Sequence, residues 1–245
     1  MSDTTPLAPM QRSPLHDEHL VLGASFTGFA GWQMPVRYSS DLVEHAAVRT
    51  AAGLFDLSHM AEISVTGADA GAFLDVALAG RLSTLPLLKA KYSLLLDESG
   101  GMIDDLIVYA SAEAEYLVVA NASNRHAVVE TLLDRQADFE VQLADLTEQL
   151  SLLAVQGPAA RAILEQTEGL EASDELSRGR TLDSLGYYAA MGMTWAGGAV
   201  FVARTGYTGE DGFELYLDNA DAPSLWRAIL AAGEPNGLVP CGLAA

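Results

Sequence analysis

Gly100-Gly-Met-Ile-Asp-Asp-Leu-Ile-Val-Tyr109 joins a Gly-Gly turn to two adjacent carboxylates and an apolar run. A run rich in β-branched and aromatic residues, bounded by glycines, predicts a strand over residues 106–109. Similar runs predict strands over 92–96 and 116–120, and helical spacing first returns at 124–134. Because several strands follow one another between helices, this order indicates an α+β fold rather than a doubly wound parallel sheet.

The rest of the chain continues the same mixture. Asp41 followed by Glu44 fits a capping box at the start of a helix that Gly53 would close. Residues 168–183 are charged and irregular and are expected to form a surface loop or the edge of a helix. Periodicity predicts helices over 16–22, 42–49, 69–78, 159–165 and 222–232, and strands within 24–36 and over 62–66, 139–145, 150–156, 191–195, 199–205 and 213–217.

The chain is strongly acidic, with a formal charge of −20 from 33 acidic residues against 13 Lys and Arg. Nucleic acid and anionic membranes need a basic face, so neither is an expected partner. The acidity fits either a solvated, self-repelling surface or a basic partner. Cys241 is the single cysteine, which excludes an internal disulfide and fits a reducing compartment. With no apolar run of about 18 residues and no basic secretory signal, the protein is expected to be cytoplasmic, with residues 1–12 as a disordered tail.

Common cofactor and nucleophile motifs are missing from the sequence. It contains neither a G-x-G-x-x-G between strand and helix nor a G-x-x-x-x-G-K-[ST], so dinucleotide and P-loop nucleotide binding are not expected. It also lacks G-x-S-x-G. Its five histidines show no metal-ligand spacing, and no metal is expected. We expect His16 and His19 on a solvated helix face and His59 as a buried histidine with satisfied hydrogen bonds.

Three carboxylates stand where they could serve a ligand. Asp104 and Asp105 are neighbours, and neighbouring strand residues point to opposite faces, so only one of them can face a pocket. Either both are turn and strand-start residues, or the inward one is a hydrogen-bond acceptor or general base. Glu214 follows a glycine-rich turn and opens an apolar strand. It is either an edge-strand glutamate in water or a buried charge that needs a partner.

Seven segments, in order, resemble the glycine-cleavage T-protein family of aminomethyltransferases. The match runs from about residue 13 to residue 245. The segments are Phe29-Ala-Gly-Trp-Gln-Met-Pro35, Gly53-Leu-Phe-Asp-Leu-Ser-His-Met60, Tyr92-Ser, Gly100-Gly-Met-Ile-Asp-Asp-Leu-Ile-Val-Tyr109, Gln156-Gly-Pro158, Arg204-Thr-Gly-Tyr-Thr-Gly-Glu-Asp-Gly-Phe-Glu214 and Gly242-Leu-Ala-Ala245.

The resemblance implies a fold. The family forms a cloverleaf of three domains around a central opening, two of them α+β (ferredoxin-like or Greek-key) and the third a C-terminal β-barrel. It implies that residues 13–57 and 155–245 form the first domain, and that residues 58–154 form the second. In the family, Arg-Asp and then the barrel follow Gly242-Leu-Ala-Ala245. Their absence here indicates either a fragment or a short paralogue, with weak folate binding expected in both cases.

The resemblance also implies a reaction and a site. An aminomethyl group on the lipoyl arm of the H-protein is transferred to tetrahydrofolate, with release of ammonia and formation of 5,10-methylenetetrahydrofolate, in glycine catabolism and one-carbon metabolism. Asp105 matches the catalytic aspartate that contacts the pterin. Glu214 matches an acceptor for the pterin amide edge, with two oxygens for adjacent N–H groups. The other positions matched to the folate opening are Tyr92, Met60, Tyr109, Asn121 and Tyr207.

Two other functions remain open beside this one. The first is a related folate-dependent demethylase, or the folate domain of a dimethylglycine or sarcosine dehydrogenase. The second is a non-enzymatic folate-binding relative that maintains iron–sulfur proteins. That relative typically carries Lys-Gly-Cys-Tyr-x-Gly-Gln where this chain has Arg204-Thr-Gly-Tyr-Thr-Gly-Glu210. The glutamate and the missing cysteine disfavour the second function.

Overall fold

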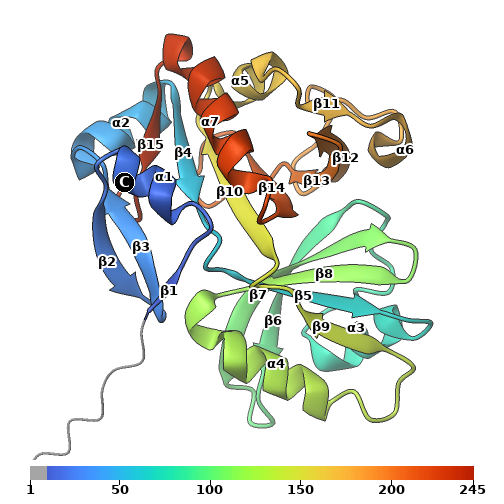
Figure 1. Cartoon of the computed structure of the whole chain (residues 1–245). Coiled ribbons are helices and arrows are strands. Elements are labelled where there is room, and N and C mark those ends of the chain that lie inside the picture. The colour runs from blue at the N-terminus through green and yellow to red at the C-terminus, as the bar shows by residue number, and fades with distance from the viewer. Residues whose placement is uncertain (1–9) are drawn as a thin grey trace, which may run out of the picture.

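Two β-sheets that pack face to face form the centre of the molecule (Figure 1). The computed structural model describes residues 10–245. Over this range the sheets have seven and five strands, and a smaller three-stranded sheet lies beside the larger one. The α+β class expected from the sequence is confirmed.

The five-stranded sheet is antiparallel, in the order β6-β7-β8-β5-β9. Along each strand, alternate apolar residues such as Ile63, Leu106 and Val118 pack against the helices on one face. The other face turns toward the larger sheet. The elements are β5 (Ala61–Thr66), β6 (Ala90–Leu96), β7 (Met102–Ala112), β8 (Glu115–Ala120), β9 (Gln142–Asp145), α3 (Ala70–Ala77), the 3₁₀ turn η1 (Ala122–Asn124) and α4 (Arg125–Asp134).

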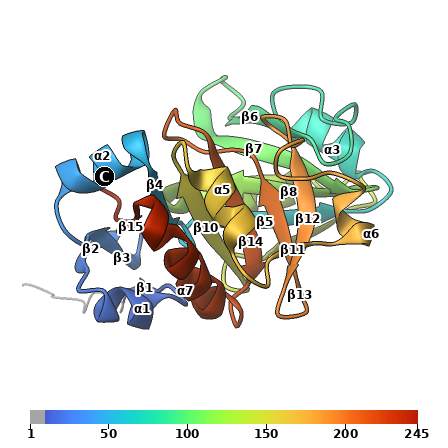
Figure 2. The ribbon, with the colours of Figure 1, turned by 90° about the horizontal axis from the view of Figure 1, so that it is seen from above.

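The seven-stranded sheet has the order β11-β12-β13-β14-β10-β4-β15 and is antiparallel except where β15 pairs with β4. Helices α5 and α7 cover one face, where Leu153, Val155 and Phe213 are buried (Figure 2). The elements are β4 (Ala52–Asp56), β10 (Leu150–Gln156), α5 (Ala160–Gln166), β11 (Glu171–Ala172), α6 (Asp174–Ser177), β12 (Ala190–Trp195), β13 (Gly198–Ala203), β14 (Gly212–Asp218), α7 (Ala222–Gly233), the 3₁₀ turn η2 (Glu234–Asn236) and β15 (Leu238–Cys241).

The N-terminal elements form a small layer that also holds the end of the chain. The buried carboxylate of Glu44 accepts hydrogen bonds from the backbone N–H groups of Tyr38 (2.8 Å), Ser39 (2.7 Å) and Gly242 (2.9 Å). Glu44 thus holds Gly242 in this layer, and the backbone N–H groups of Leu243 and Ala244 bond to the carbonyls of Pro35 (3.0 Å) and Val36 (3.1 Å). The elements of this layer are β1 (Gln11–Arg12), α1 (His16–Val21), β2 (Ser25–Phe29), β3 (Trp32–Arg37) and α2 (Asp41–Thr50).

Two expected boundaries differ from the structure. Gln11–Arg12, placed in the tail from the sequence, pairs with β3 as β1, while residues 1–9 lie outside the described range. The domain boundary expected between residues 154 and 155 falls inside β10. This strand pairs with β14 from Leu150 to Gln156 and with β4 from Leu153 to Gln156, so the chain changes sheets between Asp145 and Leu150.

Other corrections concern the ends of α2 and the segment 168–183. Ser40, not Asp41, caps α2, because its side chain accepts a hydrogen bond from the backbone N–H of Val43. Gly53 lies in β4 and does not end the helix. A Cβ at Gly53 would lie 2.6 Å from Cys241 Sγ, so close strand packing explains this glycine. The segment 168–183 contains the short β11 and α6.

The face shared by the two sheets buries a carboxyl group without a partner. Glu62 on β5 pairs with Val119 of β8, whose side chain belongs to the core between the sheets. Glu62 is fully buried, and among residues 10–245 neither of its carboxylate oxygens has a hydrogen-bond partner. Burial raises the pKa of Glu62 well above its ordinary value; Asp145 adds to this rise, and Arg125 opposes it.

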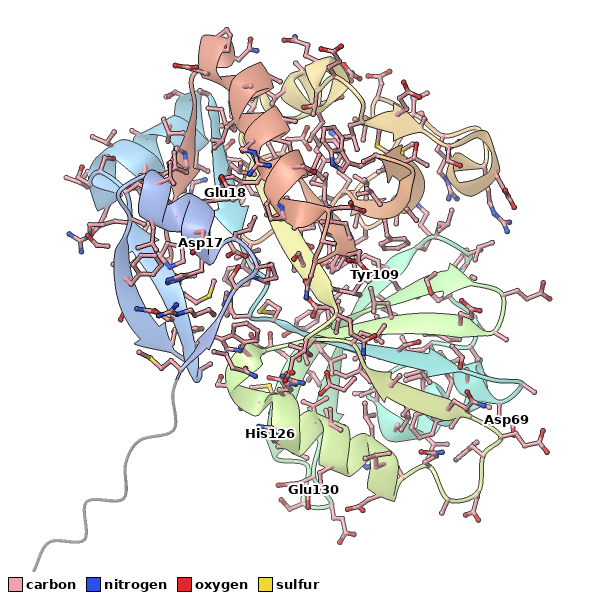
Figure 3. All side chains as sticks on the ribbon, viewed as in Figure 1. Asp17, Glu18, Asp69, Tyr109, His126 and Glu130 are labelled. Atoms are coloured by element: carbon pink, nitrogen blue, oxygen red, sulfur yellow. The ribbon has the colours of Figure 1, made fainter. Side chains whose placement is uncertain are left out.

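We predict that Glu62→Gln stabilises the protein at neutral pH. When the folded-state pKa of a carboxyl exceeds its unfolded value, the protein becomes less stable as the pH rises above the unfolded pKa, which is about 4.3 for glutamate. Glutamine cannot ionise, so the free energy of unfolding at pH 7 should rise by roughly 1–3 kcal/mol, and the gain should fade toward pH 4. Urea unfolding from pH 4 to 7 measures this. Glu130→Gln on exposed α4 (Figure 3) is the control, and destabilisation by Glu62→Gln at pH 7 would contradict the prediction.

Candidate functional site

The alternation of β7 separates the two neighbouring aspartates. Asp104 is buried on the helix side, where its carboxylate accepts hydrogen bonds from the backbone N–H (2.9 Å) and Nδ2 (2.9 Å) of Asn121 and from Nδ2 of Asn124 (2.6 Å). These bonds hold the turn that begins α4. Both aspartates lie within β7, not in the turn before it, and the hydrogen bonds of Asp104 give it a structural role.

Asp105 points to the opposite face and stays partly exposed. Its carboxylate accepts hydrogen bonds from the hydroxyl of Tyr92 (3.0 Å) and from Nδ2 of Asn121 (3.1 Å). The hydrogen bond to Asp105 raises the pKa of Tyr92, and the nearby phenol of Tyr207 adds to the rise. Asp105 is therefore an oriented carboxylate that is accessible to solvent.

Glu214 lies on β14, a strand inside the larger sheet and not at its edge. Three hydroxyls lie within hydrogen-bond distance of its Oε2: those of Thr205 (2.5 Å), Tyr109 (3.3 Å) and Tyr216 (3.4 Å). Burial raises the pKa of Glu214 and outweighs the lowering by these hydrogen bonds. The interpretation of Glu214 as an edge residue in water is wrong.

Tyr109 connects the two sheets. It leaves β7 on the same face as Asp105 and is fully buried where the sheets meet (Figure 3). Its hydroxyl reaches Thr205 (3.0 Å), in the loop after β13, and Glu214 (3.3 Å) of the larger sheet. Four residues of strand span roughly 13 Å at about 3.3 Å per residue. Asp105 and the contact between Tyr109 and Glu214 therefore lie at opposite ends of the β7 face that is turned toward the larger sheet.

A cavity of about 300 Å³ opens beside Glu214. Tyr207, which is fully exposed, belongs to its rim. The floor comes from β4, β10 and β14, whose residues Phe55, Ala154 and Glu214 pair side by side. The lining residues are His45, Val48, Arg49, Phe55, Leu57, Ala154, Gln156, Gly206, Tyr207, Thr208, Glu214, Gly242, Leu243 and Ala245.

The loop that carries Tyr207 is fixed at both ends. The Arg204 guanidinium makes two hydrogen bonds to the Asp211 carboxylate, of 2.8 and 2.9 Å, a bidentate geometry that holds orientation well. Gln156 donates to the Thr205 carbonyl (3.1 Å) inside the loop. At Gly206, where φ is +153°, a Cβ would lie 2.1 Å from the Gln156 side chain, so only glycine fits.

The structure gathers the expected site residues into two groups. Tyr92, Asp105 and Asn121 form one; Tyr109 and Glu214 form the other. Among the described residues that line the cavity, Glu214 and Tyr207 are the only members of the expected set. Met60 is partly buried against the core between the sheets and hydrogen bonds to neither group through its side chain.

Sequence reasoning missed Thr205, Tyr216 and Gln156. Tyr216 follows Glu214 by two residues, so strand alternation places both side chains on one face, and this signal was available. Thr205 reaches Glu214 across the loop that joins β13 to β14, and Gln156 reaches the carbonyl of Thr205 from a strand 49 positions earlier. No local sequence pattern reveals either contact.

Over residues 10–245, no helix is both long and apolar enough to cross a bilayer. Within the same range, no group of three or more His, Cys, Asp or Glu side chains is arranged to hold a metal ion.

The fold and the site define a class: an α+β protein of two stacked sheets with carboxylates along their shared face. The model of the GCVT N-terminal domain family matches residues 15–245. The chain is 49% identical to an aminomethyltransferase of Streptomyces coelicolor over 96% of its own length and 60% of that protein. It is 50% identical to one of Corynebacterium aurimucosum over 95% of its length and 61% of that protein.

A solved structure agrees with these relatives. The chain superimposes on the glycine cleavage system aminomethyltransferase T from Bartonella henselae with a TM-score of 0.85 at 38% identity, over 96% of this chain and 60% of the other. The chain therefore belongs to the aminomethyltransferase (glycine-cleavage T-protein) family, as the sequence motifs indicated. It spans about 60% of the length of the curated relatives it matches.

Proposed function

We propose that this protein binds tetrahydrofolate and takes part in aminomethyl transfer in the glycine cleavage system. The observation that carries the proposal is the pair of carboxylates on the shared face: Asp105, oriented and open to solvent, and Glu214, beside the cavity. Family membership supports the reaction. The relatives carry the name aminomethyltransferase, and the solved one belongs to a glycine cleavage system.

Asp105 is assigned the catalytic role. Folate supplies the nucleophilic N5 that accepts the methylene, and ammonia and the free lipoyl thiol of the H-protein leave. A carboxylate held by Tyr92 and Asn121 stabilises positive charge that develops near the pterin, without reorganisation during the reaction. Holding the reactants in position contributes as well. Glu214 would accept a pterin N–H, with Tyr109 buried behind it, and Tyr92, Asn121, Met60 and Tyr207 would line the opening.

Product formation tests the proposal. The protein, as its gene encodes it, is incubated with tetrahydrofolate and H-protein carrying an aminomethylated lipoyl arm. Ammonia and 5,10-methylenetetrahydrofolate should form in equal amounts, and H-protein without lipoate should give neither. Methylene transfer from sarcosine or dimethylglycine without H-protein, in the presence of a two-electron acceptor that oxidises their N-methyl group, would support the demethylase function instead. Folate binding without any transfer would support the non-enzymatic relative.

We predict that Glu214→Gln weakens tetrahydrofolate binding by roughly 10- to 100-fold, because hydrogen bonds to charged groups contribute about 1.5–3 kcal/mol. Titration calorimetry under anaerobic conditions measures the dissociation constant. Glu171→Gln, an exposed site on β11, is the matched control and should bind like the unchanged protein. Equal affinity for the Glu214 variant would remove Glu214 from the folate site.

A further inference from the structure

The two oxygens of Glu214 have different surroundings. All three neighbouring hydroxyls, of Thr205, Tyr109 and Tyr216, lie near Oε2. Oε1 accepts no hydrogen bond from residues 10–245 and is not among the fully enclosed side-chain atoms. Because Glu214 lines the cavity, Oε1 is the atom open to a ligand.

We infer that Thr205, Tyr109 and Tyr216 are positioning residues that occupy Oε2 of Glu214 and leave Oε1 as its single acceptor for a ligand N–H group. The identity of that ligand as tetrahydrofolate rests on the proposed function. This single acceptor differs from the expectation from the sequence, in which both oxygens of Glu214 accept from the ligand. A carboxylate oxygen has two lone pairs, and three hydroxyls already compete for those of Oε2.

The three hydroxyls are held rigidly. The rings of Tyr109 and Tyr216 pack edge to face, with centroids 5.9 Å apart, and both pack edge to face against Phe201 at 5.5 and 5.9 Å. The hydroxyls also contact one another, at 3.0 Å between Tyr109 and Thr205 and at 3.4 Å between Tyr216 and Tyr109. Burial raises the pKa of both tyrosines well above the usual value, so their hydroxyls keep the protons they donate.

The inference makes a prediction about pH. Hydroxyls that donate to Glu214 favour its charged form, so removing one should raise its pKa. Since the charged form accepts the ligand N–H, affinity is lost as pH falls through this pKa. The midpoint of that loss should move to higher pH in the variants. The titratable and charged groups that face Glu214 or its cavity are Tyr109 of β7, Tyr216 of β14, Glu62 of β5, Tyr188 before β12, Tyr207 of the loop before β14, and His45 and Arg49 of α2.

Thr205→Val tests the inference, because it removes the hydroxyl that lies nearest to Oε2 of Glu214 and keeps the shape of the side chain. The Glu214 carboxyl is followed by ¹³C NMR in ligand-free protein labelled at glutamate, with the signal assigned through Glu214→Gln. We expect its titration midpoint to rise by about one to two pH units in Thr205→Val and by less in Tyr216→Phe, whose contact is longer. Thr205→Ser keeps a hydroxyl and should restore the midpoint.

Matched controls separate this effect from loss of folding. Thr167→Val and Tyr116→Phe remove buried hydroxyls that do not contact Glu214 and should leave its midpoint unchanged. An unchanged Glu214 midpoint in folded Thr205→Val and Tyr216→Phe would overturn the inference. The pH dependence of tetrahydrofolate affinity should move with the same variants. If the carboxyl titration moves but tetrahydrofolate binds no variant at any pH, the inference stands and the proposed function fails.

Discussion

Replacing Asp105 by asparagine is expected to lower the rate of aminomethyl transfer by roughly 10²- to 10⁴-fold, the range typical of a lost acid–base or charge-stabilising group. Asparagine keeps the shape of the side chain and can still accept from Tyr92, but it has no charge to offset the positive charge that develops on the ligand. Asp105 is partly exposed and lies outside the apolar cores, so the fold should remain. Single-turnover kinetics with tetrahydrofolate and aminomethylated H-protein measure the rate.

The neighbouring aspartate makes this prediction specific. Asp104→Asn should act on stability, because an amide group replaces a buried carboxylate that accepts from Asn121 and Asn124. Asp134→Asn at the exposed end of α4 is the chemical control and should change neither rate nor stability. A near-normal transfer rate in folded Asp105→Asn protein would overturn the catalytic role.

The division of roles between these aspartates was accessible from the sequence because strand alternation is a local property. Period two places Asp104 and Asp105 on opposite faces whatever the rest of the chain does. The alternation alone does not say which face meets a helix and which meets the candidate site, since that depends on the packing of a second sheet; only the family resemblance singled out Asp105. Glu62 illustrates the same point: its strand was predicted correctly, but at Glu62 the face turned away from the helices is buried as well.

Sheet order explains why Glu214 was ambiguous. The strand over 213–217 was predicted, but its place between β10 and β13 follows from pairings with residues about 10 to 70 positions away. The strand β15 was missed because Pro240 disfavours a strand assignment. It lies at the end of the sheet order, where a proline that cannot donate to a neighbour is tolerated.

The histidines of α1 show where local reasoning failed. A short, polar helix suggested that His16 and His19 are solvated, yet both are buried. His19 Nε2 lies 2.8 Å from Asp56 Oδ2, and the Tyr38 hydroxyl lies 2.8 Å from its Nδ1. His59 is buried as expected, but its Nδ1 has no hydrogen-bond partner among residues 10–245. The burial of His19 was missed because its partner Asp56 lies 37 positions away, and helical periodicity contains no information on such a distant contact.

The buried Asp56 leads to the largest expected change in stability. Asp56→Ala should lower the free energy of unfolding by roughly 3–5 kcal/mol, because it leaves buried donors without their acceptor. The carboxylate accepts from the Ser13 hydroxyl, from His19, and from the backbone N–H of Ser58 at 2.9 Å. Urea unfolding at pH 7 measures the loss, and Asp134→Ala serves as the exposed control.

The pH dependence distinguishes this network from ordinary core packing. Burial alone would raise the pKa of Asp56, but hydrogen bonds from His19, Ser13 and Ser58 outweigh it, and the pKa is lowered. A depressed folded-state pKa gives stability that is present above the unfolded value of about 3.9 and is lost as pH falls through the folded value. The stability that the Asp56 carboxylate adds relative to Asp56→Ala should therefore be present at pH 5 and shrink as the pH falls below about 4. In a double-mutant cycle, His19→Ala should cost less in the Asp56→Ala background, since the two side chains are in contact. Additive losses, or a difference that does not change with pH, would show that Asp56 acts by packing alone.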